Sequence, residues 1–139
     1  MAGKLPVYLV LDVSASMYGE PIRGVESGVR SLKSALLRDP MARESAHLSV
    51  VTFADEVKQL TPMTPVERFE PPKLLAAGGT RLGAALAALP KFAENDVVKT
   101  TPDKRGDFAP YVFLLTDGFS TDDVASGARE FNAYGAWAG

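Results

Sequence analysis

Two patterns of apolar positions organise the chain. Three segments are almost continuously apolar, as strands buried on both faces of a parallel sheet are: Leu5–Leu11, Leu48–Phe53 and Tyr111–Leu115. Between the first two, apolar residues recur at intervals of three and four, the period of one helix face: Ile22, Val25, Val29, Leu32 and Leu36. Strands that alternate with helices predict an α/β domain with a mostly parallel central sheet and helices on both faces.

Weaker signals complete the order of strands. A short edge strand is expected at Val57–Leu60, joined to the preceding strand by a hairpin at Ala54–Glu56. The four prolines within 61–72 predict a loop, and Leu74–Ala77 is expected to form one helical turn. The predicted sheet order is edge strand, second strand, first strand and then Tyr111–Leu115.

Proline and glycine mark the expected limits of the first helix. Pro21 suits a first helical turn, and Asp39-Pro40 is expected to end the helix. Gly24 and Gly28 lie inside it, where glycine is unfavourable, so close packing of the helix on the sheet is the predicted reason for them.

Two further helices are expected downstream. Residues Arg81–Leu89 are rich in alanine and leucine and predict a helix, which Pro90 kinks or breaks before it continues over 91–99. A polar loop follows, and a last helix is expected over about 121–134.

Composition narrows the class of protein. The 139 residues are 46% hydrophobic and 23% charged, which predicts one globular domain over residues 1–139. The formal net charge of −2 gives no bulk attraction to nucleic acid or to an anionic membrane, so neither is expected as a partner. There is no cysteine and only one histidine, His47, which excludes thiolate sites and makes a zinc site or a Ser-His-Asp triad hard to build. No membrane span or signal peptide is evident, so a cytoplasmic location is expected.

Hydroxyl and carboxylate side chains gather where the apolar strands end. The first strand runs into Asp12, Ser14 and Ser16, whose alternate spacing points them to one side of an extended backbone. Thr80 follows a pair of glycines, and Asp117 follows Tyr111–Leu115. Carboxyl ends of neighbouring parallel strands meet at one edge of a sheet. Because hard oxygen ligands suit small hard cations, these five residues predict a site for Mg²⁺ or Mn²⁺.

This arrangement resembles the metal-ion-dependent adhesion site of von Willebrand factor A domains. That family's pattern is Asp-x-Ser-x-Ser, then a distant Thr and a distant Asp, and all five positions match in order. The wider sequence is similar to the bacterial tellurium-resistance proteins of the TerY type. The segments that carry this similarity are LPVYLVLDVSASM, GEPI, LSVVTFAD, GGTRLGAAL and VFLLTDG.

The resemblance implies a Rossmann-like fold and a binding module rather than an enzyme. It also implies that Ser14, Ser16 and Thr80 coordinate the metal directly, and that Asp12 and Asp117 act through water or as hydrogen-bond acceptors. An Asp or Glu of a partner protein would complete the coordination. The TerY-type resemblance suggests a kinase or a phosphatase of the same gene cluster, in tellurium or stress resistance, as that partner.

Other interpretations of the same residues stay open. Asp12, Ser14 and Ser16 could cap the helix that follows, and Thr80 could cap its own helix, in a metal-free scaffold. A phosphoryl-transfer enzyme of the haloacid-dehalogenase type also begins with a strand ending in Asp. It needs a second carboxylate two residues later, where this chain has Ser14. A Walker nucleotide motif is absent.

The C-terminal part departs from the family pattern. Family domains usually continue past the last predicted helix with at least one more strand, so a C-terminally shortened sheet is expected. Tyr111–Leu115 would then form an exposed sheet edge, and self-association through that edge is predicted.

Overall fold

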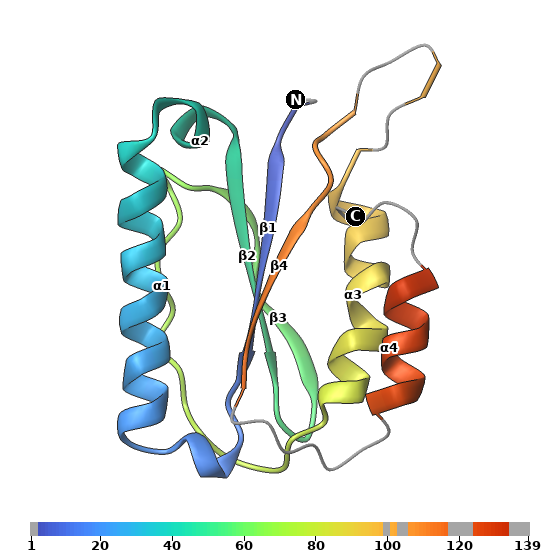
Figure 1. Ribbon diagram of the computed structural model, residues 1–139. Coiled ribbons are helices and arrows are strands. Elements are labelled where there is room, and N and C mark those ends of the chain that lie inside the picture. The colour runs from blue at the N-terminus through green and yellow to red at the C-terminus, as the bar shows by residue number, and fades with distance from the viewer. Residues whose placement is uncertain (1–2, 99–100, 103–105, 117–123, 134–139) are drawn as a thin grey trace.

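A four-stranded sheet lies between helices in the computed structural model, which describes residues 3–98, 101–102, 106–116 and 124–133 (Figure 1). The elements are, in chain order, β1 (Leu5–Asp12), the short 3₁₀ helix η1 (Ala15–Met17), α1 (Glu20–Arg38), α2 (Pro40–Ser45), β2 (Ala46–Phe53), β3 (Val57–Pro65), α3 (Leu82–Asp96), β4 (Tyr111–Leu115) and α4 (Val124–Ala133). One face of the sheet carries α1, and the opposite face carries α3 and α4 (Figure 1). The predicted α/β class is confirmed.

The strand order is β3-β2-β1-β4, as the sequence predicts. β1 runs parallel to β2 and to β4, and β3 pairs antiparallel with β2. The register aligns Asp12 with Phe53 of β2 and Leu11 with Leu115 of β4. The ends of β1, β2 and β4 therefore lie at one edge of the sheet, and the loops that follow them begin side by side.

The central strand β1 divides the core into two halves. Val7, Leu9 and Leu11 belong to the cluster on the α1 face, whereas Tyr8 and Val10 belong to the cluster beneath α3. All five side chains are buried. Burial of an apolar side chain of this size stabilises the folded state by roughly 1.5–3 kcal/mol. Because both faces of β1 are buried, its sequence is almost continuously apolar.

The connecting segment, residues 66–81, crosses the α1 face of the sheet between β3 and α3 (Figure 1). Its buried residues Val66, Phe69 and Leu74 join the core on that face. Two side chains of α1 hold its backbone: Lys33 donates to the Phe69 carbonyl, and Glu26 accepts a hydrogen bond of 2.8 Å from the Leu74 amide. The segment is thereby fixed against α1.

The predicted helical turn at Leu74–Ala77 is wrong, because the connecting segment is not helical there. The amide of Ala77 donates to the carbonyl of Val13 at 2.8 Å. This amide is therefore bonded to the loop after β1 and not to a carbonyl within a helical turn. β3 is longer than the predicted strand and continues through Pro65. Proline is tolerated there because β3 is an edge strand, in which an amide facing solvent is not needed.

Asp39 and Pro40 end one helix and begin another. α1 stops at Arg38, as expected, but the unpredicted α2 starts at Pro40. The Asp39 carboxylate accepts hydrogen bonds from the amides of Met41 and Ala42, which makes it the N-cap of α2. A residue pair that stops a helix is also a favourable start signal for the next one.

α3 continues through Pro90 to Asp96 without a break. Buried positions at intervals of four, Ala85, Leu89 and Ala93, keep one face of this helix in the core on both sides of the proline. Packing of this face therefore offsets the hydrogen bond that Pro90 cannot make. No helix among the described residues is both long and apolar enough to cross a membrane.

The expected role of Gly24 and Gly28 is wrong. Both are exposed, and a Cβ built at either position meets no atom within 4 Å. Close packing occurs elsewhere, at Gly127 of α4, where a Cβ would clash with the carbonyl oxygen of Gly83 in α3. Glycine at 127 thus allows α3 and α4 to touch through their backbones.

β4 is less buried than its apolar sequence predicts. Tyr111, Phe113 and Leu115 are 51%, 47% and 41% exposed. Their register with Val7, Leu9 and Leu11 places them on the α1 face of the sheet. The core cluster that α1 and the connecting segment form on this face includes residues of β1 and β2 but none of β4. Val112, which points to the opposite face, packs beneath α3 and α4. Among the described residues β4 is an edge strand.

Candidate functional site

The carboxylate of Asp12 lies fully buried at the end of β1. Its Oδ1 accepts a hydrogen bond of 2.8 Å from the amide of Ser14, and its Oδ2 accepts one of 2.8 Å from the hydroxyl of Thr116. The first bond folds the backbone back on itself directly after the strand. The second joins the loops after β1 and β4. Asp12 therefore fixes two of the three loops at this edge of the sheet.

Ser14 and Ser16 face one another in the loop after β1. Their hydroxyls share a hydrogen bond of 3.1 Å, in which either oxygen can be the donor, and Ser14 is only 1% exposed. The two hydroxyls meet although the backbone is not extended as predicted, because Ser14 is the N-cap of η1 and Ser16 lies within that 3₁₀ helix. Asp12 lies behind them through its bond to the Ser14 amide.

The connecting segment brings Thr80 to the same edge. The amide of Ala15 donates to the carbonyl of Gly78 at 3.0 Å, and the amide of Arg81 donates to the carbonyl of Ala54 after β2 at 3.1 Å. Thr80 lies between these two anchors and is 6% exposed.

Gly78 makes this approach possible. Its φ of 86° lies in the left-handed region that favours glycine. A Cβ at this position would also lie 2.5 Å from a carboxylate oxygen of Asp55, whose other oxygen accepts from the Gly79 amide at 2.8 Å. The glycine pair therefore serves close backbone packing next to Thr80.

Helix capping does not account for the hydroxyl residues. The N-cap of α1 is Gly19, and that of α3 is Arg81 rather than Thr80. Ser14 is the N-cap of η1, but its side chain makes no capping hydrogen bond. The structure therefore assigns neither Ser14 nor Thr80 as a side-chain cap of a helix.

The spacing of the two serine hydroxyls fits a metal ion of the predicted kind. Ligands at 2.0–2.1 Å from an octahedral Mg²⁺ are separated by about 3 Å when they occupy adjacent positions. The observed Ser14–Ser16 oxygen separation of 3.1 Å matches this edge. Ser14, Ser16 and Thr80 could supply neutral oxygen ligands, and Asp12 the nearby negative charge.

The fifth predicted ligand, Asp117, lies outside the described residues. Thr116, the residue before it, is a site residue that sequence reasoning missed. The predicted strand order alone does not identify it, because the register that pairs Leu11 with Leu115, and so brings Thr116 to Asp12, comes from the structure. Among the described residues no three His, Cys, Asp or Glu side chains form a metal-binding group, so hydroxyls dominate the candidate site there.

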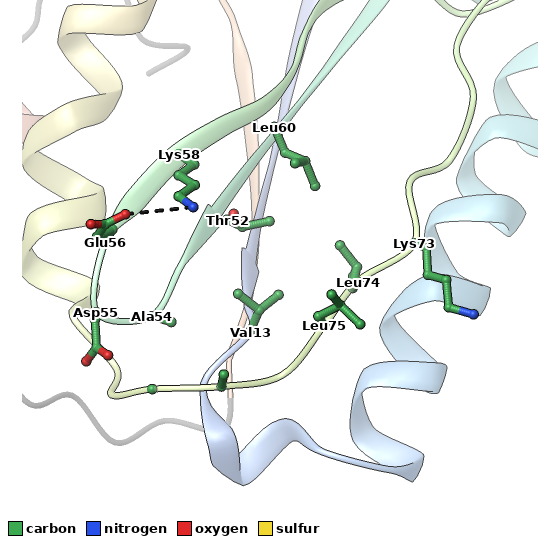
Figure 2. Close-up of a pocket in the computed structure, with 12 residues that line it drawn as sticks. Val13, Thr52, Ala54, Asp55, Glu56, Lys58, Leu60, Lys73, Leu74 and Leu75 are labelled. Carbon is green, nitrogen blue, oxygen red and sulfur yellow. Dashed lines mark ion pairs between the residues drawn. The ribbon is translucent and has the colours of Figure 1, made fainter.

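A hollow of about 480 Å³ adjoins the site on the α1 face of the sheet (Figure 2). Val13 and Gly78, which belong to the loops of the site, form part of its lining. Figure 2 shows Leu60 of β3 and Leu75 of the connecting segment on opposite sides of it, and both side chains are exposed. The lining of this hollow is therefore partly apolar.

Comparison with known proteins places the chain in a family. The family model for the von Willebrand factor type A domain matches residues 7–137, which is most of the chain. No curated protein sequence matches.

Solved structures show the same fold at low sequence identity. The vWF domain of the type V pili tip protein Mfa5 from Porphyromonas gingivalis has a TM-score of 0.62 at 18% identity, over 86% of this chain and 40% of that one. Proximal thread matrix protein 1 from the mussel byssus has a TM-score of 0.64 at 19% identity, over 95% and 36%. The ArnB paralog VWA2 from Sulfolobus acidocaldarius has a TM-score of 0.61 at 19% identity, over 88% and 30%.

This chain therefore spans well under half the length of those three relatives. At such identity the likeness concerns the fold, whereas the family match extends over nearly the whole chain. The protein belongs to the von Willebrand factor type A domain family.

Proposed function

We propose that this domain binds a protein partner through a divalent metal ion held at the edge of the sheet where β1 and β4 end. Domains of this family are commonly protein-interaction modules. The observation that carries the proposal is the pair of serine hydroxyls 3.1 Å apart, with the buried Asp12 carboxylate directly behind them.

Each residue has a distinct role in this proposal. Ser14, Ser16 and Thr80 bind Mg²⁺ or Mn²⁺ through their hydroxyl oxygens. Asp12 accepts hydrogen bonds from the Ser14 amide and the Thr116 hydroxyl, so it orients the loops and supplies negative charge without leaving its buried position. Asp117 contributes the second carboxylate. The metal has the Lewis acidity to accept one further oxygen, from an Asp or Glu of the partner.

Neutral ligands matter for the choice of partner. Hydroxyls leave the ion more electropositive than carboxylate ligands would, so an anionic oxygen is favoured at the open position. The same feature argues against catalysis of the haloacid-dehalogenase type, because the position that would hold its acid/base group is Ser14. Its hydroxyl faces Ser16 and cannot replace a carboxylic acid in that role.

The biological setting of this proposal rests on the resemblance to TerY-type proteins. It suggests a cytoplasmic role in tellurium or stress resistance, with a kinase or phosphatase of the same gene cluster as the partner. Co-purification from the source cell with and without a chelator tests it. A partner retained equally well in excess chelator would contradict a metal-bridged complex.

Calorimetric titration with Mg²⁺ and Mn²⁺ tests the metal site itself. The wild type is expected to bind one ion, and the double variant Ser14→Ala/Ser16→Ala is expected to bind none. Ser31→Ala/Ser34→Ala removes two exposed serine hydroxyls from α1 and serves as the matched control, with wild-type binding. Identical titrations of the wild type and the Ser14/Ser16 variant would favour the alternative, a metal-free scaffold.

A further inference from the structure

The outer face of α1 carries three exposed arginines, Arg23, Arg30 and Arg38. They are seven and eight residues apart and span about 22 Å along the helix axis, at 1.5 Å per residue. The helix contains two acidic residues. Glu20 lies in the first turn, whereas Glu26 is directed to the connecting segment, where it accepts from the Leu74 amide. Most of this face is therefore positively charged.

These arginines lack the partners that a solvated helix usually provides. None of the three forms an ion pair or a side-chain hydrogen bond within the described part of the chain. The positions four residues after Arg23 and Arg30 hold Ser27 and Ser34. Glu26 lies four residues before Arg30, but its carboxylate accepts from the Leu74 amide and forms no ion pair with the arginine. Because the whole chain has a formal net charge of −2, this face is a local reversal of sign.

The surface between the arginines consists of small and polar residues. Serines and arginines line a shallow hollow of about 240 Å³: Ser27, Arg30, Ser31, Ser34 and Arg38. Gly24 and Gly28 lie beside it, although nothing in the domain packs on them. Small residues on a helix let a second helix approach closely, since the distance between helix axes depends on the side chains at the contact.

We propose that the outer face of α1 docks an acidic helix of a protein partner. Carboxylates at intervals of seven or eight residues on that helix would each meet one arginine, whose planar guanidinium binds a carboxylate through two parallel hydrogen bonds. The serines and glycines would form the floor of the contact. Charge complementarity selects an acidic partner, and the spacing along one straight helix selects a helical one. This surface is separate from the metal site and does not depend on it.

A synthetic peptide tests the proposal with the full chain. The probe is a capped, fluorescently labelled alanine-based helix with two adjacent glutamates in every heptad, and its control has glutamine at those positions. Fluorescence anisotropy is expected to show binding of the glutamate peptide that weakens at about 0.15 M salt, where exposed charges are screened. The glutamine peptide is expected not to bind.

Surface variants locate the contact. Arg30→Glu/Arg38→Glu is expected to weaken binding at least about tenfold, because like charges then face one another. Gly28→Leu is expected to weaken binding, because the larger side chain would prevent the peptide helix from approaching α1 closely. Lys91→Glu on α3 makes a charge reversal of the same kind at an exposed position on the opposite face and is expected to bind as the wild type does. Circular dichroism checks that each variant is folded.

Several outcomes would overturn the proposal. These are no binding of the glutamate peptide, equal binding of the glutamine peptide, or equal binding by the Arg30→Glu/Arg38→Glu variant. Binding to phosphatidylserine vesicles or to inorganic phosphate in place of the peptide would also overturn it, and would assign the arginines to a lipid or phosphate ligand.

Discussion

Thr116 and Asp12 are joined by a hydrogen bond of 2.8 Å, in which the threonine hydroxyl donates to Oδ2 of the carboxylate. The two residues are 104 positions apart in the sequence and meet because β4 runs parallel to β1. Since Asp12 also accepts from the Ser14 amide, this one carboxylate links the ends of two strands to the hydroxyl ligands of the candidate metal site.

Removal of the Thr116 hydroxyl should weaken metal binding without unfolding the domain. Thr116→Val keeps the shape of the side chain but leaves Asp12 with one donor fewer. Groups that orient metal ligands typically affect affinity by about 10–100-fold. Calorimetric titration with Mg²⁺ measures the loss. Thr64→Val removes an exposed hydroxyl that bonds only locally, to Pro62, and should titrate as the wild type does. Equal affinity in both variants would contradict the orienting role of Thr116.

Asp12→Asn should abolish metal binding while the fold survives. The amide oxygen can still accept from Ser14, and the amide nitrogen can donate to the Thr116 hydroxyl, so both hydrogen bonds persist with one reversed. Asp12→Ala removes both acceptors and should cost roughly 1–3 kcal/mol for each buried group left unsatisfied. Metal titration and urea denaturation of both variants separate the two effects. Retained affinity in Asp12→Asn would mean that the carboxylate acts through structure alone.

Two glycine substitutions should have opposite effects on stability. Gly28→Ala adds a methyl group in open space on an exposed helix face, so the free energy of unfolding should rise by about 1 kcal/mol. Gly127→Ala places its Cβ against the Gly83 carbonyl and should lower the free energy of unfolding by about 1–3 kcal/mol. Urea denaturation of both variants gives the comparison. Stabilisation by Gly127→Ala would show that α3 and α4 are not in backbone contact.

Self-association through β4 stays a prediction from the sequence, and the exposure of Phe113 gives it a specific test. The mass measured by light scattering should rise with concentration, because β4 has no charge, proline or bulge to protect its edge, whereas β3 contains prolines and register shifts. Phe113→Lys should hold the chain as a monomer. Leu60→Lys on β3 is the matched control, since both side chains are 47% exposed. A wild-type mass that is monomeric at every concentration would contradict the prediction.

Most of the fold could be predicted from the sequence, because each central element has one clear pattern of apolar residues. β1 and β2 are almost continuously apolar since both of their faces are buried, and α1 has an apolar stripe on a single side. The errors fall where a contact distant in the sequence overrides local preference. Leu74–Ala77 looks helical, but its backbone is held by Glu26 and Val13.

In the candidate site, too, some features could be predicted from local sequence and others depend on the folded structure. Asp12, Ser14 and Ser16 could be predicted as candidate site residues because they lie at alternate positions where a strand ends. The extended backbone expected for them is wrong beyond Asp12, since Ser16 lies in the 3₁₀ helix η1. The 3.1 Å separation of the two serine hydroxyls, by contrast, is fixed by the folded loop.

The sequence by itself determined the fold class and the strand order and identified the residue types of the candidate site, because hydrophobic periodicity and strand-end chemistry are local properties. Only the tertiary structure decided which side chains serve one another. Parallel pairing of β1 with β4 delivers Thr116 to Asp12, and the bonds of the connecting segment bring Thr80 to the same edge. The exposed positions of Gly24 and Gly28 and the open face of β4 likewise depend on which surfaces meet, and that follows from packing over long sequence separations.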